Sequence, residues 1–145
     1  RTAEQDRMFK EGLGLIRVPY SHRDVTALKL TSTPAEQARR YNDRGWTHFE
    51  SMVTDFKTPS ERSPFTVHNV LVCDDRFEPE GPTGPDVLEG LAKAPRKPPL
   101  TPQRFREELE VRRQRAEAKG EPLFTNGQDS PIILERYDAS FEELC

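Results

Sequence analysis

A short apolar run followed by a helical pattern and a second apolar run constrains the fold of this chain more than any other feature. Residues 24–31 are rich in Val, Leu and Thr, which is typical of a β-strand. Residues 43–57 place their large apolar side chains on one helical face, and residues 65–73 form the second run. Two strands joined through a helix need a crossover connection, so the pattern predicts two parallel strands packed against a helix.

Details of the first strand and the helix give more specific expectations. Because apolar residues follow one another almost without interruption in the strand, we expect both of its faces to be buried. Asn42 or Asp43 is the expected N-cap of the helix. Its apolar face comprises Trp46, Phe49, Met52, Val53 and Phe56.

The segments on either side predict further helices and an extended arm. Residues 2–20 form an N-terminal helix that begins with a capping box of Thr2 and Gln5. Its expected apolar stripe comprises Phe9, Leu13, Ile16 and Tyr20. Residues 74–100 are rich in Pro and Gly, which predicts an extended surface arm with a hint of a short helix.

Two helices are expected at the C-terminal end. The first begins with the cap Thr101-Pro102, and the second begins at Ser130-Pro131. A turn is expected between them, at Asn126-Gly127.

The predicted fold class is therefore α/β, with a small parallel sheet, flanking helices, a long proline-rich arm and C-terminal helices. We expect an α/β unit over residues 1–73 and the arm over residues 74–100. Residues 101–145 are expected to pack back onto this unit or onto a partner.

Composition limits the classes of function. Only 33% of the residues are hydrophobic and 32% are charged, which predicts a small core. The net charge of -3 gives no global positive field, so we do not expect nucleic acid as a partner. No apolar run approaches the roughly 20 residues of a membrane span. The two cysteines are far apart and fit neither a disulfide framework nor a metal site. We expect a soluble protein in a reducing compartment, in the cytoplasm, inside an organelle or at the periphery of a larger complex.

The candidate site lies at the start of the central helix, in Arg44-Gly45-Trp46. Trp46 and Glu50 are four residues apart and so share one helical face. This helix follows the carboxyl end of a strand, the edge at which open parallel sheets bind ligands. An indole wall beside a carboxylate could hold a sugar or a nicotinamide. Alternatively, Trp46 is a core residue and Glu50 is a solvated residue that favours the helix dipole.

Histidine and arginine residues give weaker signals. His22, His48 and His68 lack the spacing of metal ligands, so no metal site is predicted. His22 follows Tyr20 at the entrance to the first strand and is the histidine we include among the candidates. The basic run at residues 112–115 is expected to be a solvated helix face.

Several of these residues together resemble a known family. Leu28-Lys29-Leu30-Thr31-Ser32, a loop containing Tyr41, and the helix from Trp46 to Glu50 resemble the strand, loop and Trp-x-x-x-Glu helix of TIR domains. The resemblance implies that Glu50 is the catalytic carboxylate of an enzyme that cleaves NAD, with Trp46 as a wall of the site.

The match is more specific to an uncharacterised TIR-like module of microbial eukaryotes. It rests on Tyr41-x-x-Arg44-Gly45-Trp46-x-x-Phe49-Glu50, Tyr20-x-His22 and the segment from Phe124 to Asp129, and it covers most of the chain. The first strand of a TIR domain and its loop would lie before Arg1, so the resemblance implies a module that lacks its N-terminal half.

Two functions follow as expectations. The first is a non-catalytic interaction or structural module, an accessory subunit or fragment of a larger assembly, with protein partners and no cofactor. Its polar composition and long arm favour this hypothesis. The alternative is a TIR-like hydrolase of NAD, or a nucleotide-binding domain, that uses Glu50.

Overall fold

The computed structural model describes residues 2–37, 39–62, 69–74, 84–93, 96–125 and 129–144. Its elements in chain order are α1 (Ala3–Leu15), α2 (Arg17–Ser21), β1 (Ala27–Leu30), the 3₁₀ helix η1 (Tyr41–Asp43), α3 (Gly45–Asp55), β2 (Val70–Cys73), α4 (Pro85–Ala92), α5 (Pro102–Ala118) and α6 (Asp129–Leu144). The expected α/β class, a small parallel sheet with flanking helices, is confirmed. The predictions for residues 65–68 and for Asn126-Gly127 lie outside the described residues.

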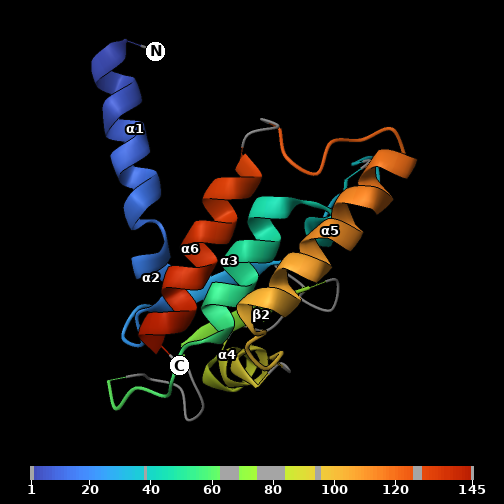
Figure 1. Ribbon diagram of the computed structural model, residues 1–145. Helices are drawn as coiled ribbons and strands as arrows, with labels where there is room; N and C mark the ends of the chain where they lie inside the picture. Colours follow the sequence, from blue (N-terminus) through green and yellow to red (C-terminus); the bar gives the residue numbers. More distant parts are fainter. Residues whose placement is uncertain are drawn as a thin grey trace.

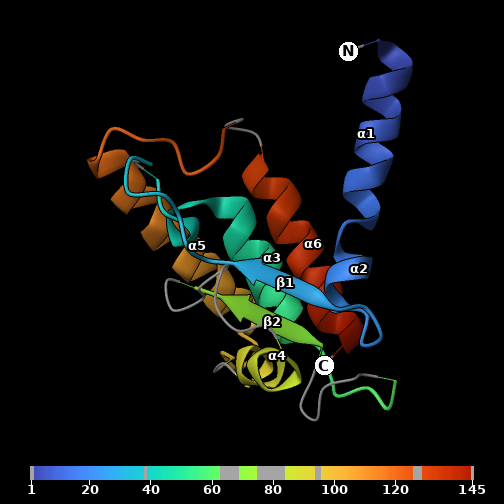
Figure 2. The ribbon, with the colours of Figure 1, turned by 180° about the vertical axis from the view of Figure 1, so that it is seen from behind.

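The sheet consists of β1 and β2, which pair in parallel with Ala27 opposite Val70 and Leu30 opposite Cys73. Helix α3 lies between the two strands in the chain, as the crossover pattern predicts. Figure 2 shows the two strands in front, with α3 and α6 behind them. One face of the sheet therefore packs on helices.

The expectation that β1 is buried on both faces is wrong. Lys29 is only 8% exposed, whereas Leu28 is 56% exposed and Leu30 is 60% exposed. Side chains alternate between the two faces of a strand, and α3 covers only the face to which Lys29 points. The apolar residues on either side of Lys29 consequently face away from the core.

The hydrophobic core lies between α3, α5 and α6. It comprises Phe49, Met52, Val53, Phe56, Phe105, Leu109, Ala116, Leu123, Phe124, Ile133 and Tyr137. The rings of Phe105 and Tyr137 stack with their centroids 3.8 Å apart, and the Tyr137 hydroxyl donates to the Leu100 carbonyl at 2.9 Å. The C-terminal helices therefore share one core with the helix between the strands (Figure 1).

The start of α3 differs from the expected cap. The N-cap residue is Arg44, whose side chain makes no capping hydrogen bond, and the predicted caps Asn42 and Asp43 belong to η1. The Thr47 hydroxyl donates to the carbonyls of Tyr41 and Arg44. These bonds hold η1 against the first turn of α3.

The N-terminal helix begins with the predicted capping box of Thr2 and Gln5. It is not one helix to Tyr20, because α1 ends at Leu15 and α2 follows it. No residue of α1 is buried, and Phe9 is 44% exposed. Figures 1 and 2 both show α1 projecting from the rest of the molecule, so the expected apolar stripe meets the core only at its far end, at Ile16 and Tyr20.

The expected arm is not extended throughout. It contains α4, which begins with Pro85 in the first turn and buries Ala92 completely. This helix packs against β2, as Figure 2 shows. Within the described ranges, no helix combines the length and the apolar character needed to cross a membrane.

Candidate functional site

A cleft of about 530 Å³ lies at the N-terminal end of α3. Its lining comprises Gln37, Arg39, Arg44, Gly45, Trp46, Thr47, Glu50, Leu123, Phe124 and Thr125. The structure therefore brings together three predicted site residues, Arg44, Trp46 and Glu50. Leu123, Phe124 and Thr125 also line the cleft, and the sequence predicted no site role for them.

Gly45 determines how closely that segment approaches α3. Its backbone N–H donates to the Leu123 carbonyl at 3.1 Å. A Cβ atom at Gly45 would lie only 2.0 Å from Cε1 of Phe124. The glycine between Arg44 and Trp46 thus makes room for the Phe124 ring, which explains in physical terms why the helix begins with this residue.

The sequence left open whether Trp46 is a wall of the site or a core residue, and its position combines the two. Its indole N–H donates to Oδ2 of Asp129, the first residue of α6, at 2.8 Å. The ring contacts Phe49 edge to face, with centroids 6.1 Å apart. The indole is therefore fixed at the edge of the core and also forms one wall of the cleft.

Two guanidinium groups give the cleft positive charge. Arg39 Nη2 donates to the Leu123 carbonyl at 2.9 Å, and Arg44 Nη2 donates to the Arg39 carbonyl at 3.3 Å. The Arg39 Nε atom is buried and has no hydrogen-bond partner among the described residues. Arg39 was missed by sequence reasoning because its role depends on a carbonyl 84 positions away.

Among the described residues that line the cleft, Glu50 is the one with an acidic side chain. Burial raises the pKa of its carboxyl group, although the hydrogen bond that the Tyr20 hydroxyl donates to it acts in the opposite direction. A raised pKa favours the protonated form of this carboxyl group, which can donate a proton.

Glu50 also borders a second, smaller pocket of about 190 Å³ beside β1. Tyr20 and Tyr41 form part of the lining of this pocket. Burial, followed by the nearby Glu50 charge, raises the pKa of Tyr41 to about 12, so its phenol stays protonated at neutral pH. Tyr41 therefore lies near Glu50, but it lines this pocket and not the cleft.

His22 lies apart from these groups. It is exposed at the C-terminal end of α2, where its Nδ1 accepts a hydrogen bond from the Asp24 N–H at 3.2 Å. It lines neither the cleft nor the pocket beside β1. The nearby buried group is Lys57, whose ammonium donates to the carbonyls of Pro19, His22 and Val25.

His48 is a core residue. Its ring is almost fully buried and stacks on Phe105, with centroids 5.3 Å apart. Its neighbours form no metal centre: in the part of the chain that the structure describes, no group of three His, Cys, Asp or Glu side chains could hold a metal ion.

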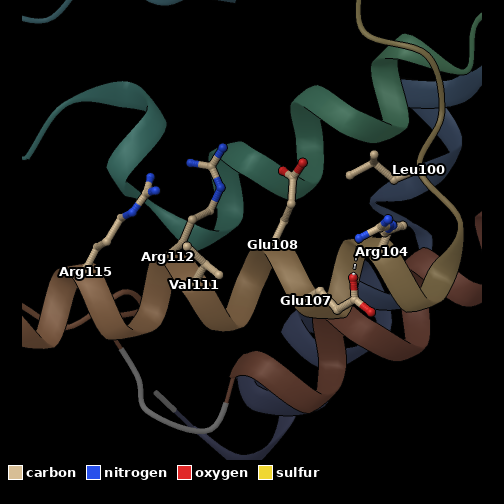
Figure 3. A pocket seen from close by; sticks show the side chains of 7 residues that line it. All are labelled: Leu100, Arg104, Glu107, Glu108, Val111, Arg112 and Arg115. Carbon is tan, nitrogen blue, oxygen red and sulfur yellow. Dashed lines mark hydrogen bonds and ion pairs between the residues drawn. The ribbon is translucent and has the colours of Figure 1, made fainter.

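A groove of about 590 Å³ runs along α5 (Figure 3). It is lined by Leu100, Arg104, Glu107, Glu108, Val111, Arg112 and Arg115. Arg104 pairs with Glu107 at 2.9 Å, and Arg112 donates to the Asn42 carbonyl. Because Glu107 and Glu108 lie between Arg104 and Arg112 along this helix, the described lining is not a continuous basic surface.

Comparisons with known proteins identify no relative of this chain. No family model matches the chain, and neither the curated proteins nor the solved structures contain a significant match.

Proposed function

We propose that this chain is a non-catalytic protein-interaction module that binds an extended segment of a partner protein along the free edge of β1. The observation that carries the proposal is the exposure of Leu28 and Leu30 on this strand. An edge strand with unpaired backbone groups and large exposed apolar side chains favours pairing with another strand.

The backbone of β1 offers the matching hydrogen bonds. The N–H of Ala27 donates to Asn69 and that of Thr31 donates to Cys73, both at 2.9 Å. In a parallel ladder alternate residues point toward the paired strand, so the N–H and C=O groups of Leu28 and Leu30 point away from β2. No other strand borders β1 among the described residues.

An added strand would gain two kinds of contact. Its backbone would pair with Leu28 and Leu30, and its side chains on the open face would cover the two leucine side chains. The described sheet has two strands, fewer than independent sheets usually need for stability. A third strand therefore extends the hydrogen-bonded ladder and buries apolar surface at the same time.

A phage-displayed library of random peptides tests this proposal on the intact chain. Selected peptides should slow hydrogen exchange of the Leu28 and Leu30 amides in NMR spectra. Leu30→Pro should abolish binding because it removes an outward N–H, and proline is tolerated at that position of an edge strand. Leu30→Ile is the matched control, since it keeps both the N–H and a large apolar side chain and should retain most of the binding.

Three results would contradict the proposal. One is a library that yields no binder, and another is a set of binders that leaves exchange at both amides unchanged. The third is normal binding by Leu30→Pro, after circular dichroism has shown that this variant is folded.

A second candidate function is the cleavage of NAD or the binding of a related nucleotide at Glu50. The cleft favours it, because two arginines, the indole of Trp46 and the carboxyl group of Glu50 line one space. The arginines could bind phosphates, and the carboxylate could stabilise a developing positive charge. Release of nicotinamide from NAD should then occur with wild type and be lost with Glu50→Gln. Equal rates for the two proteins would remove the proposed role of Glu50.

A further inference from the structure

The small pocket beside β1 is placed where a strand bound to this edge would project its side chains. It is lined by Tyr20, Ala27, Leu28, Lys29, Leu30, Tyr41, Glu50 and Thr54. Two of these residues, Glu50 and Thr54, belong to α3. Side chains of an added strand alternate between the two faces of the sheet, so every second one would point toward α3, the side on which Glu50 and Thr54 line this pocket.

The pocket contains a carboxylate that lacks a cationic partner. Among the described residues, no Lys, Arg or His side chain forms an ion pair with Glu50, and the Tyr20 hydroxyl donates a hydrogen bond to it. The ammonium group in the pocket lining belongs to Lys29, which is bound to Asp55 at 2.6 Å and to Ser51. When it is ionised, Glu50 therefore carries a negative charge that no cationic side chain of the described residues balances.

The walls of the pocket suit a long side chain with a cationic end. The aromatic rings of Tyr20 and Tyr41 can pack on an aliphatic stem, and their faces attract a cation. Burial is the main cause of the raised pKa of both phenols, which keeps them uncharged at neutral pH. The Glu50 carboxylate in the same lining provides the opposite charge.

We propose that the pocket receives a lysine or arginine side chain of the bound segment, and that its cationic group pairs with Glu50. The inference rests on the proposed function and specifies the partner: an extended segment in which a basic residue stands between apolar residues. The basic side chain points toward α3, and its apolar neighbours cover Leu28 and Leu30 on the open face. A segment with an acidic residue at the same position is repelled by Glu50.

Three synthetic peptides test the inference with the full chain. They share the sequence Thr-Val-x-Val-Thr with blocked ends, and the central residue is lysine, norleucine or glutamate. In NMR titrations the lysine peptide should bind about tenfold more tightly than the norleucine peptide, which corresponds to one charge-assisted hydrogen bond. The glutamate peptide should bind more weakly than both.

Protein variants then assign the preference to one residue. Glu50→Gln should abolish the advantage of the lysine peptide and leave the norleucine peptide unchanged. Glu107→Gln, on the exposed face of α5, is the matched control and should keep the advantage. The comparison of peptides on wild-type protein gives a result even if the Glu50 variant does not fold.

The outcomes separate this inference from the proposed function. Equal binding of the lysine and norleucine peptides, with protection of the Leu28 and Leu30 amides, overturns the basic-residue inference and leaves the strand-binding function intact. A lysine preference that persists in Glu50→Gln also overturns it. If none of the peptides binds, the result contradicts both.

Discussion

Lys29 of β1 and Asp55 of α3 form an ion pair, with 2.6 Å between Nζ and Oδ1 and both side chains almost fully buried. The same ammonium group donates to the carbonyl and the hydroxyl of Ser51, each at 3.1 Å. Burial lowers the pKa of Lys29, and its contacts with Asp55 act in the opposite direction. The pair joins strand to helix and thereby determines which face of β1 meets the core and which stays open.

Removal of one partner should be strongly destabilising. Lys29→Ala would leave the Asp55 carboxylate buried without its cation, and we expect a loss of about 3–5 kcal/mol in the free energy of unfolding. Urea unfolding followed by circular dichroism measures it. Lys10→Ala, which breaks the exposed pair with Asp6 on α1, is the matched control and should cost less than about 1 kcal/mol.

Replacement of both partners should distinguish the effect of an unpaired buried charge on stability from the effect of lost packing. The double variant Lys29→Met with Asp55→Leu removes both charges while it fills similar space, so it should be far more stable than Lys29→Ala. Equal instability of the two proteins would show that shape, and not an unpaired charge, causes the loss.

The contact between Gly45 and Phe124 gives a second prediction. Gly45→Ala places a methyl group within 2.0 Å of the ring, so the ring or the helix must shift. We expect a loss of about 1–3 kcal/mol in thermal or urea unfolding, the usual cost of overpacking. Gly12→Ala in α1, where nothing lies within 4 Å, should instead be stabilising by about 0.5–1 kcal/mol.

A double variant tests the cause. Phe124→Ala removes the ring, so Gly45→Ala should have a much smaller effect in that background. An unchanged cost in the double variant would refute the steric explanation.

Elements that depend on local signals were predictable. The cap formed by Thr101 and the proline after it was expected, and the Thr101 hydroxyl accepts a hydrogen bond from the Arg104 N–H at 3.3 Å. The helical spacing of the apolar residues also predicted the buried face of α3. Both signals lie within a few residues of the structure that they determine.

Features that depend on distant partners were not predictable. Lys29 points inward because its partner Asp55 lies 26 positions further along the chain, and no local pattern shows this. Within the cleft, Arg44, Trp46 and Glu50 were expected because they share the first turns of one helix. Phe124 was part of the family resemblance but was not predicted as a site residue, because the loop that carries it approaches α3 only in the folded chain.

The hydrogen bond between Trp46 and Asp129 gives a third prediction. Asp129→Ala removes a charged acceptor of the indole N–H and an acidic residue from the first turn of α6, so we expect a loss of about 1.5–3 kcal/mol. Asp129→Asn keeps an oxygen acceptor and should cost less. Urea unfolding gives the energies, and the NMR shift of the indole N–H reports the bond directly. An indole signal that is unchanged in Asp129→Ala would contradict the assignment.

The burial of His48 gives a fourth prediction, on pH. Burial, followed by the charges of Arg112 and Lys97, lowers the pKa of His48 to about 3. The Glu108 carboxylate lies 3.6 Å from Nε2 of His48, but it is partly exposed and makes no hydrogen bond with this atom. It therefore does not reverse the lowering of the His48 pKa.

The unfolded chain, with a histidine pKa near 6.5, takes up this proton before the folded chain does, so stability should fall as the pH falls from about 6.5 toward 3. The slope due to this one group is at most about 1.4 kcal/mol per pH unit. The raised pKa of Glu50 acts in the opposite direction in acid, so the effect of His48 must be isolated as a difference between two proteins. Urea unfolding of wild type and His48→Gln across this range should show wild type losing more stability as the pH falls. Parallel curves for the two proteins would mean that the His48 ring is not held in its neutral form.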